Sequence, residues 1–433
     1  MTDDLAGAKD LFKQPYYHGY IVREDIGRML RQVGDFLVRL SIPVAGSEKA
    51  YILSVVQKKK RNDKDGKTLK HFIISKTPKG RFMVSKASFA TIVELVDHYF
   101  IKKNEISCGS NIVLTTPVGR KAWEIDHDNV TVSRVIGEGA FASVHIGKFQ
   151  CQQTHKELPT AIKCAKLSTI TKLQIKEIMK EARLMRKMNH ANVIKLYGVA
   201  AGKEPLMLVM ELATDGALDK YLRKNKVDYE TKLKMAVGSA FGIEYLHGIG
   251  ILHRDIAARN CLYSSGYIKI ADFGLSVEGL EYKMEPTCKV PIKWLAPETI
   301  RTKMYYKQTD VFTWAIMLWE IFSDGAEPYP DMSNLDVIRK TCKDNYRMSL
   351  PEEVPQTLKY FIVSKCWTAT YTERPSMTEV AAFLEKETGI LRASQMSGGN
   401  EDELNEPPKV SGEKEGTKTP NITNKKKHNL LVM

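Results

Sequence analysis

The sequence has few cysteines and no long apolar run. Its seven cysteines among 433 residues form no CxxC pair and no metal-ligand spacing, which argues against a disulfide framework or a cysteine-based zinc site. No apolar segment approaches the roughly 18 residues that a membrane-spanning helix needs. The N-terminus is polar and acidic, unlike a secretory signal, and Thr2 excludes N-myristoylation. These absences predict a cytoplasmic protein.

Positive charge is in excess, with 65 Lys and Arg against 51 Asp and Glu, a formal net charge of +14. Such a balance favours anionic partners. Part of the excess lies in two basic clusters, residues 58–61 and 425–427. Solvated loop and tail is the ordinary interpretation of such clusters. The alternatives are weak peripheral association with the inner face of the plasma membrane and nuclear targeting. No nucleic-acid-binding motif is present, so no nucleic acid partner is expected.

The hydrophobic pattern divides the chain into segments of an α+β multidomain protein. We expect an N-terminal extension (1–13), a front domain (14–118), a linker (119–127), a large domain (128–390) and a tail (391–433). The tail is polar, punctuated by Pro and Gly and basic near its end. Because it has no aromatic residue and little apolar surface to bury, it is predicted to be disordered.

The front domain has the pattern of a small sheet between helices. Residues 36–40 alternate so that Arg39 faces away from Phe36 and Val38. Two further β-rich runs, 51–56 and 72–75, predict partner strands. Between them, Asp65-Gly66 predicts a turn. Apolar residues spaced by three, four and three predict a helix packed on the sheet: Phe89, Ile92, Val96 and Tyr99.

These motifs resemble an SH2 domain: Tyr17-His18-Gly19, the FLVR strand ending at Arg39, and the FATIVELVDHY helix. Tyr16 stands where that family usually has Trp, and another aromatic should preserve the fold. The resemblance implies a central antiparallel sheet flanked by two helices that binds phosphotyrosine proteins. Arg39 would hold two phosphate oxygens through its planar fork. The other pocket residues implied by the resemblance are Arg23, Ser41 and His71.

The large domain contains HRDIAARN (253–260) and a DFG sequence that begins at Asp272. Asp255 is a candidate catalytic base, and Asn260 and Asp272 are candidate ligands for Mg²⁺ or Mn²⁺. The set resembles a bilobal protein kinase that uses ATP. Arg259 and Ala257 give the AAR sequence of protein-tyrosine kinases, whereas serine/threonine kinases usually carry Lys at position 257.

The same resemblance implies an ATP site at the front of the large domain. Lys163 would contact the α- and β-phosphates, and Glu181 on the following helix would pair with it. Ala142 replaces the third glycine of the kinase glycine-rich loop, which should leave ATP binding in place. The remaining expected ATP contacts are Gly137, Glu138, Gly139, Ala140, Phe141, Val144, Ala161, Met210, Glu211, Ala213 and Leu262.

Several further motifs complete the kinase pattern. Pro291–Trp294 resembles the tyrosine-kinase substrate shelf, a second indication of a tyrosine acceptor. Tyr282 stands where Fes/Fer-type kinases carry an autophosphorylated tyrosine, and its phosphate could pair with Arg254. Asp310 is expected to brace the catalytic loop, and a buried Glu298–Arg374 pair is expected to be structural.

The combined pattern resembles a short form of the Fes/Fer group, without an F-BAR region or an SH3 domain. It predicts a non-receptor tyrosine kinase that the SH2 domain recruits to phosphotyrosine proteins and that phosphorylation of Tyr282 activates. A weakly active or inactive SH2 adaptor is the alternative of a different class, favoured only by Ala142. A dual-specificity or serine/threonine kinase is opposed by Ala257, Arg259 and Trp294.

Overall fold

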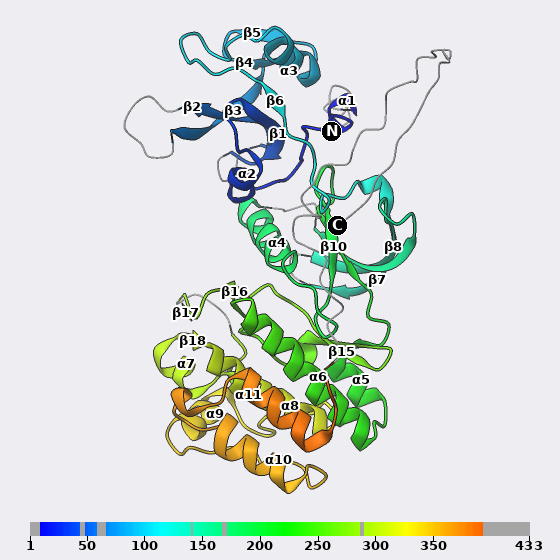
Figure 1. The fold of residues 1–433 in the computed structure, drawn as a ribbon, viewed down its shortest axis with the longest axis vertical. Coiled ribbons are helices and arrows are strands. Elements are labelled where there is room, and N and C mark those ends of the chain that lie inside the picture. The colour runs from blue at the N-terminus through cyan, green and yellow to red at the C-terminus, as the bar shows by residue number, and fades with distance from the viewer. Residues whose placement is uncertain are drawn as a thin grey trace, which may run out of the picture.

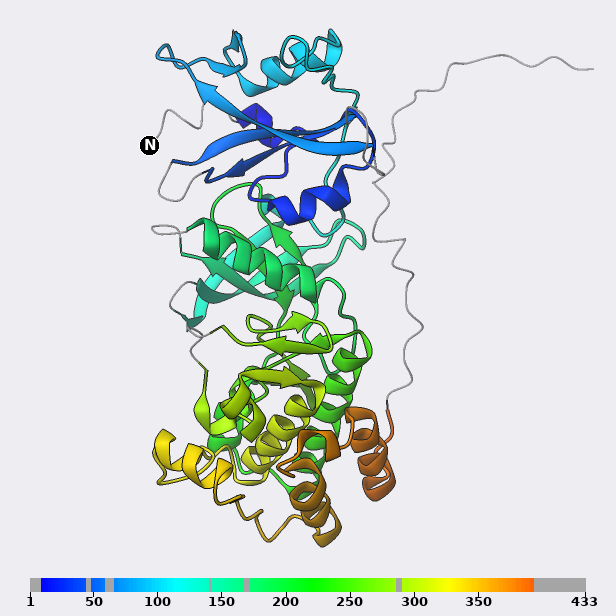
Figure 2. The same ribbon diagram turned by 90° about the vertical axis from the view of Figure 1, so that its left-hand side faces the viewer.

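The computed structural model describes residues 9–43, 48–58, 66–139, 142–166, 171–285 and 290–392. Three tiers follow one another along the chain: a front domain, then an upper and a lower lobe of the large domain (Figure 1). The view turned by 90° shows the same stack (Figure 2). The predictions for Ala140, Phe141, the Asp65 turn, the rest of the basic cluster after Lys58, and the tail from residue 393 lie outside the described residues.

The front domain is built on a six-stranded sheet in the order β5-β4-β3-β2-β1-β6. Phe36 pairs with Val55 and Arg39 with Ile52 across the antiparallel β1–β2 ladder. β6 adds a short parallel edge beside β1, which the sequence pattern did not indicate. The strands are β1 (Asp35–Ser41), β2 (Ala50–Lys58), β3 (Lys67–Lys76), β4 (Phe82–Val84), β5 (Ala87–Phe89) and β6 (Thr116–Pro117).

Two helices flank this sheet, α2 (Arg23–Met29) and α3 (Ile92–Ile101). Of the predicted stripe, Ile92, Val96 and Tyr99 lie on α3 and are buried against the sheet. The prediction was wrong for Phe89, which lies in β5 and is only partly buried, because the helix begins at Ile92 after its cap Thr91. Thr91 caps α3 by accepting the backbone N–H of Glu94, which satisfies one free donor of the first turn. The strand alternation and the helical spacing of the sequence therefore identify residues that lie in the core of this domain.

Two residues near the N-terminus also belong to the front core. Leu11, in the short helix α1 (Lys9–Phe12), is fully buried there, although the sequence pattern places it in an extension. The Tyr16 ring lies 5.6 Å from the Phe36 ring and fills the position expected for Trp. The fold therefore accommodates the Tyr16 replacement, as predicted.

The upper lobe is a five-stranded antiparallel sheet in the order β10-β11-β9-β8-β7, with one helix. Helix α4 begins with a capping box in which Thr171 and Gln174 bond each other's backbone N–H groups. The elements are β7 (Val130–Glu138), β8 (Ala142–Gln150), β9 (Glu157–Ala165), α4 (Lys172–Met185), β10 (Leu196–Ala200) and β11 (Met207–Glu211).

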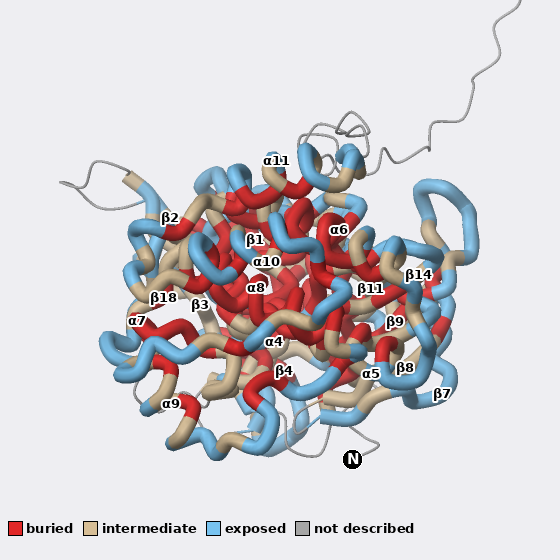
Figure 3. Tube along the Cα trace, turned by 90° about the horizontal axis from the view of Figure 1, so that it is seen from below, coloured by how far each residue is buried: buried red, intermediate tan, exposed pale blue. Residues whose placement is uncertain are grey.

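The lower lobe is mainly helical and packs around α8, every residue of which from Thr309 to Phe322 is buried. Seen from below, the buried segments run through the interior around α8 and α6 (Figure 3). Among the described residues, no helix has the length and apolar character needed to cross a bilayer. The helices are α5 (Leu218–Lys224), α6 (Tyr229–Gly248), α7 (Pro297–Thr302), α8 (Lys307–Phe322), α9 (Asn334–Cys342), α10 (Gln356–Phe361) and α11 (Met377–Thr388).

Short strands carry the functional loops of the lower lobe. β12, β14 and β15 form one small sheet, β13 pairs with β16, and β17 pairs with β18. Their bounds are β12 (Gly216–Ala217), β13 (Ile251–Leu252), β14 (Cys261–Ser264), β15 (Tyr267–Ile270), β16 (Val277–Glu278), β17 (Glu281–Lys283) and β18 (Met304–Tyr306).

The front domain and the upper lobe share one hydrophobic cluster. Tyr20 and Val22 of the front domain pack with residues of α4, including Ile175. The Tyr20 N–H donates to the carbonyl of Ala201 at 3.0 Å. Gly19 has φ +58°, and a Cβ there would lie 2.0 Å from the same carbonyl oxygen. Only glycine therefore fits this approach between the domains.

The linker packs against both domains. Arg120 donates to the carbonyls of Phe12 and Tyr17, at 2.6 and 3.0 Å. Glu124 lies 2.7 Å from the ring nitrogen of buried His18. The Trp123 ring lies 3.9 Å from the guanidinium of Arg186 on α4. The linker therefore fixes the front domain on the upper lobe and is not a flexible spacer.

Candidate active site and phosphate pocket

Asp255 lies in the loop formed by residues 253–260, and Arg259 and Asn260 of the same loop both donate hydrogen bonds to it. Arg259 donates to the Asp255 carboxylate at 2.5 Å. Asn260 donates its Nδ2 to the Asp255 carbonyl at 2.8 Å, which leaves its side-chain oxygen available. The loop is held by Asp310, whose carboxylate accepts the N–H groups of His253 and Arg254, each at 2.9 Å. The predicted bracing by Asp310 is therefore confirmed.

The electrostatics of Asp310 suit this bracing role. Burial alone would raise its pKa, but the hydrogen bond and charge of His247, with the loop's backbone donors, outweigh burial and lower the pKa. Asp310 therefore stays ionised and continues to accept the loop's N–H groups.

Asp272 lies beside this loop, since the Ala271 N–H donates to the Asn260 carbonyl at 3.0 Å. Asp272 has φ +58°, a conformation that is uncommon for a non-glycine residue and is often found at functional sites. Its side chain is exposed. An amide oxygen and a carboxylate are hard oxygen donors, so the pair fits Mg²⁺ or Mn²⁺.

Lys163 on β9 meets Glu181 on α4, with its Nζ at 2.9 and 2.7 Å from the two carboxylate oxygens. Glu181 is buried. Burial opposes the charge on Lys163, but Glu181 and more weakly Asp272 outweigh burial and raise the pKa of Lys163. A charged ammonium is therefore kept next to the catalytic loop, positioned by α4.

The expected nucleotide contacts lie on adjoining strands. Gly137 pairs with Val144 in the β7–β8 hairpin, and the Gly139 N–H donates to the Ala142 carbonyl at 2.8 Å. Ala161 on β9 pairs with Met210 on β11. Ala142 is therefore the first residue of β8.

Two contacts join the nucleotide region to the lower lobe. Leu262 on β14 and Met210 both pack against the lower-lobe core. Glu211 forms an ion pair with Lys269 at 2.8 Å, and Ala213 follows it as a buried residue. The segment after β11 therefore connects the two lobes.

The AAR sequence and the substrate shelf are in direct contact. The Arg259 guanidinium lies 4.3 Å from the Trp294 ring. Glu320 accepts the Trp294 indole N–H and the Ala258 backbone N–H, each at 3.0 Å. Burial raises the pKa of Glu320 to about 7. The two sequence features that indicate a tyrosine acceptor therefore form one unit.

Tyr282 lies on β17, opposite Tyr305 of β18. The Arg254 guanidinium stacks 3.8 Å from the Tyr282 ring and donates to the Leu275 carbonyl at 2.7 Å. Arg254 is buried, and its Nε has no hydrogen-bond partner within the described ranges. Residues 286–289 of the same loop lie outside the described residues.

A cavity of about 310 Å³ in the front domain brings together the four residues expected to bind phosphotyrosine. Arg39 is 5% exposed, and its Nε has no hydrogen-bond partner in the described part of the chain. Burial, and next the charge of Arg23, lower the pKa of Arg39 to about 10. Burial and the two arginines lower the pKa of His71 to about 4. The remaining member of the four is Ser41, also in the cavity wall.

A buried guanidinium without an anion is unfavourable, because burial of an unpaired charge carries a large desolvation penalty. The arrangement around Arg39 therefore has the character of an anion site. One wall of the cavity is formed by Lys172 and Lys176 of α4, in the large domain. This wall could not be seen from the front-domain sequence alone.

Comparison with known families agrees with this geometry. Residues 16–99 match the SH2 domain model, and residues 130–384 match the model described as protein tyrosine and serine/threonine kinase. The chain is 37% identical over 383 residues to Fer-related kinase 1 of Caenorhabditis elegans, covering 88% of this chain and 94% of that relative.

The chain belongs to the Fer/Fps family of SH2-containing tyrosine kinases. It is 34% identical to tyrosine-protein kinase Fer of Rattus norvegicus over 380 residues, 86% of this chain and 44% of that relative. It is 34% identical to transforming protein Fps of avian sarcoma virus (strain PRCII), covering 86% of this chain and 67% of that relative. It thus spans less than half of rat Fer.

The SH2–kinase contact contains residues that sequence reasoning missed. Asp25 on α2 accepts three hydrogen bonds from α4 and its end: two from Arg183 at 2.8 and 3.0 Å, and one from Arg186 at 3.0 Å. Its neighbour Glu24 pairs with Lys176 at 2.9 Å in a more exposed position. The only local signal was an acidic pair in the first turn of a helix, which also suits the helix dipole.

Glu320 was likewise missed. It stands in the apolar run of α8, between Trp319 and Ile321, where an acidic residue is unusual. Such a residue needs partners when buried. An acid in an otherwise apolar helix was the signal that could have identified it, whereas its contacts with Ala258 and Trp294 required the fold.

Proposed function

We propose that this chain transfers the γ-phosphoryl group of ATP to tyrosine side chains of proteins. The observation that carries the proposal is the placement of Arg259 between the Asp255 carboxylate and the Trp294 shelf. Asp255 accepts the acceptor proton and orients the hydroxyl, an effect that typically contributes about 10²–10⁴-fold. The shelf holds the acceptor far enough from the loop for a long side chain.

Nucleotide binding involves the other residues expected at this centre. Lys163, held by Glu181, contacts the α- and β-phosphates. Asn260 and Asp272 would hold Mg²⁺ or Mn²⁺, which when bound would offset charge on the phosphates. The hairpin residues Gly137 to Val144, with Ala161, Met210 to Ala213, and Leu262, enclose the nucleotide.

The SH2 domain brings the enzyme to proteins that already carry phosphotyrosine, which raises the local concentration of substrate. Arg39 anchors the phosphate, with Arg23, Ser41 and His71 around it. Because Lys172 and Lys176 of α4 also line the pocket, an occupied pocket steadies the helix that carries Glu181. Phosphotyrosine binding therefore supports catalysis as well as recruitment.

Phosphorylation of Tyr282 is the second control. A phosphate there carries about −1.5 to −2 charges and three acceptor oxygens. Arg254 lies against Tyr282 with an unused buried donor, so it supports an ion pair that orders the loop. We place the enzyme in the cytoplasm, with weak attachment to the inner face of the plasma membrane through its basic clusters.

The activity is tested by Asp255→Asn in a radiolabelled-ATP assay on a tyrosine-containing copolymer. The variant should lose at least about 10²-fold in kcat, the lower end for a positioned acid–base group. An SH2 adaptor, which Ala142 favours, would leave the wild-type protein without labelling even after Tyr282 is phosphorylated by an added kinase. Retained activity in Asp255→Asn would show that another residue is the base.

A further inference from the structure

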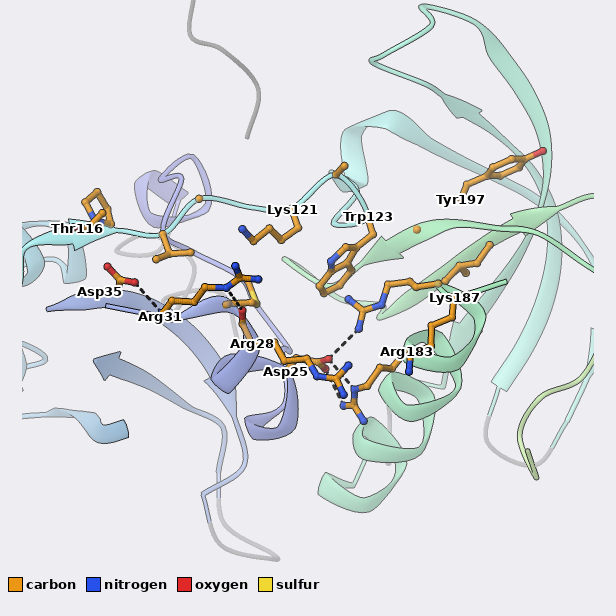
Figure 4. Close-up of a pocket in the computed structure, with 18 of the residues that line it drawn as sticks. Asp25, Arg28, Arg31, Asp35, Thr116, Lys121, Trp123, Arg183, Lys187 and Tyr197 are labelled. Atoms are coloured by element: carbon orange, nitrogen blue, oxygen red, sulfur yellow. Dashed lines mark hydrogen bonds and ion pairs between the residues drawn. The ribbon is translucent and has the colours of Figure 1, made fainter. Parts of the chain in front are cut away.

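A second cavity lies where the SH2 domain, the linker and the kinase upper lobe meet (Figure 4). Its volume is about 760 Å³, within the range of small-molecule sites. We call it the junction cleft. It shares no lining residue with the phosphotyrosine pocket. The side chains used below come from α2, the turn after it and the start of β1, from the linker, and from α4 and its C-terminal end: Asp25, Arg28, Arg31, Asp35, Lys121, Trp123, Arg183, Arg186 and Lys187.

The cleft has an excess of positive charge, with six cationic side chains and only two carboxylates. Both carboxylates are already engaged. Asp25 holds Arg183 and Arg186, and Asp35 accepts the backbone N–H groups of Arg31 and Gln32 at 2.9 and 2.7 Å. Neither carboxylate is therefore free to neutralise the remaining cations.

Three of the cations lack an acidic partner in the part of the chain that the structure describes. Lys187 pairs with Glu278 at 2.7 Å. Within the described ranges, no carboxylate pairs with Arg28, Arg31 or Lys121. Figure 4 shows Arg28 and Arg31 reaching from the SH2 side and Lys121 from the linker. The unpaired charges thus come from two different segments around one hollow.

The cleft also has a flat wall. The Arg186 guanidinium covers the Trp123 ring at 3.9 Å, while Asp25 holds the same guanidinium from the side. The stacked pair therefore lies where α2 of the SH2 domain meets the C-terminal end of α4. Because the cations surround one cleft on several segments, the site suits a compact polyanion better than an extended chain.

We propose that the junction cleft binds a small molecule that carries several phosphate groups on a ring, of the inositol polyphosphate class. Arginine forks bind phosphate oxygens in pairs, and three unpaired cations on two segments can hold more than one phosphate. Such a ligand bridges α2 and the linker beside α4. It therefore stabilises the docked arrangement of the SH2 domain on the kinase.

The test is isothermal titration of the full chain with inositol hexakisphosphate, with an ATP-competitive inhibitor present to block the nucleotide site. We expect saturable binding and a rise in Tm, since a ligand that binds only the folded chain stabilises it. The Arg28→Ala/Arg31→Ala variant should bind at least about 10-fold more weakly. Both arginines are exposed, so this variant should fold.

Two controls fix the location. Lys79→Ala/Lys86→Ala removes two exposed cations of the same domain outside the cleft and should leave the affinity unchanged. Arg39→Ala disables the phosphotyrosine pocket and should also leave it unchanged. A second cleft variant, Lys121→Glu, reverses a charge on the linker and should weaken binding even if the arginine variant is unstable.

Vesicles containing phosphatidylinositol bisphosphate separate the two sources of such a ligand. Cosedimentation that depends on Arg28 and Arg31, without binding of the soluble compound, identifies a lipid headgroup. Tight binding of the soluble compound identifies a free metabolite. Either result supports the site. Binding that is lost in Arg39→Ala but not in the cleft variants, or no binding in either format, overturns the proposal.

Discussion

Asp25 is the buried anion that joins the SH2 domain to α4, and Asp25→Asn should uncouple the two domains. Its side chain is 3% exposed, whereas its partners Arg183 and Arg186 are 16% and 19% exposed. The substitution keeps the shape of the side chain but removes the charge that three hydrogen bonds use. Glu24, the adjacent residue, is a matched control because its ion pair with Lys176 is 46% exposed on both sides.

Removal of one partner from a buried ion pair costs about 3–5 kcal/mol. Because both arginines keep some contact with water, we expect the lower end, about 3 kcal/mol. This corresponds to roughly a 100-fold shift in the docking equilibrium. Glu24→Gln breaks an exposed pair, so its cost should stay within about 1 kcal/mol.

Two measurements report the loss of coupling between the SH2 domain and α4. Copolymer phosphorylation at saturating ATP should be slower in Asp25→Asn, because α4 loses its support and the Lys163–Glu181 pair forms less often. Backbone hydrogen exchange across α4 should accelerate in the same variant, since local opening becomes easier. Glu24→Gln should resemble the wild type in both. Unchanged exchange and activity in Asp25→Asn, or equal losses in both variants, would refute the reasoning.

Three further predictions concern single residues. Arg39→Lys keeps the charge but loses the planar fork, so phosphotyrosine-peptide affinity should fall about 10- to 100-fold by calorimetry; unchanged affinity would exclude Arg39 as the anchor. Tyr282→Phe should abolish the rise in activity that follows preincubation with ATP, and a full rise would place the switch elsewhere. Burial raises the pKa of Glu320 to about 7. The folded state therefore holds a proton that the unfolded chain releases above its ordinary carboxyl pKa of about 4.3, and stability should fall as pH rises from about 4.3 to 7. Glu320→Gln should remove this fall and stabilise the protein by up to about 3 kcal/mol at pH 8 in denaturant unfolding; an unchanged pH profile would argue against a protonated Glu320.

The sequence predicted those parts of the site whose chemistry lies in short motifs. Asp255, Arg259 and Asn260 stand within six residues, so one loop places them together. Arg39 follows from strand alternation, which puts it on the face opposite Phe36. In such cases local spacing determines which side chains meet.

The sequence did not predict the contact between the domains. Asp25 and Arg183 are 158 positions apart, and each alone is an ordinary charged residue on a helix. The same holds for Lys172 and Lys176, which appear as solvated helix charges until the SH2 domain is docked beside them. The packing of the linker depends on Trp123 and Arg186, also distant in the chain. Contacts of this kind depend on the packing of whole domains.

The central claim is that Arg259 and Trp294 select a tyrosine acceptor, and acceptor choice tests it most directly. The purified full chain would be given radiolabelled ATP and three peptides that differ only at one position, with Tyr, Ser or Phe. The account predicts labelling of the Tyr peptide alone, and its loss in Asp255→Asn. Comparable labelling of the Ser peptide would contradict it.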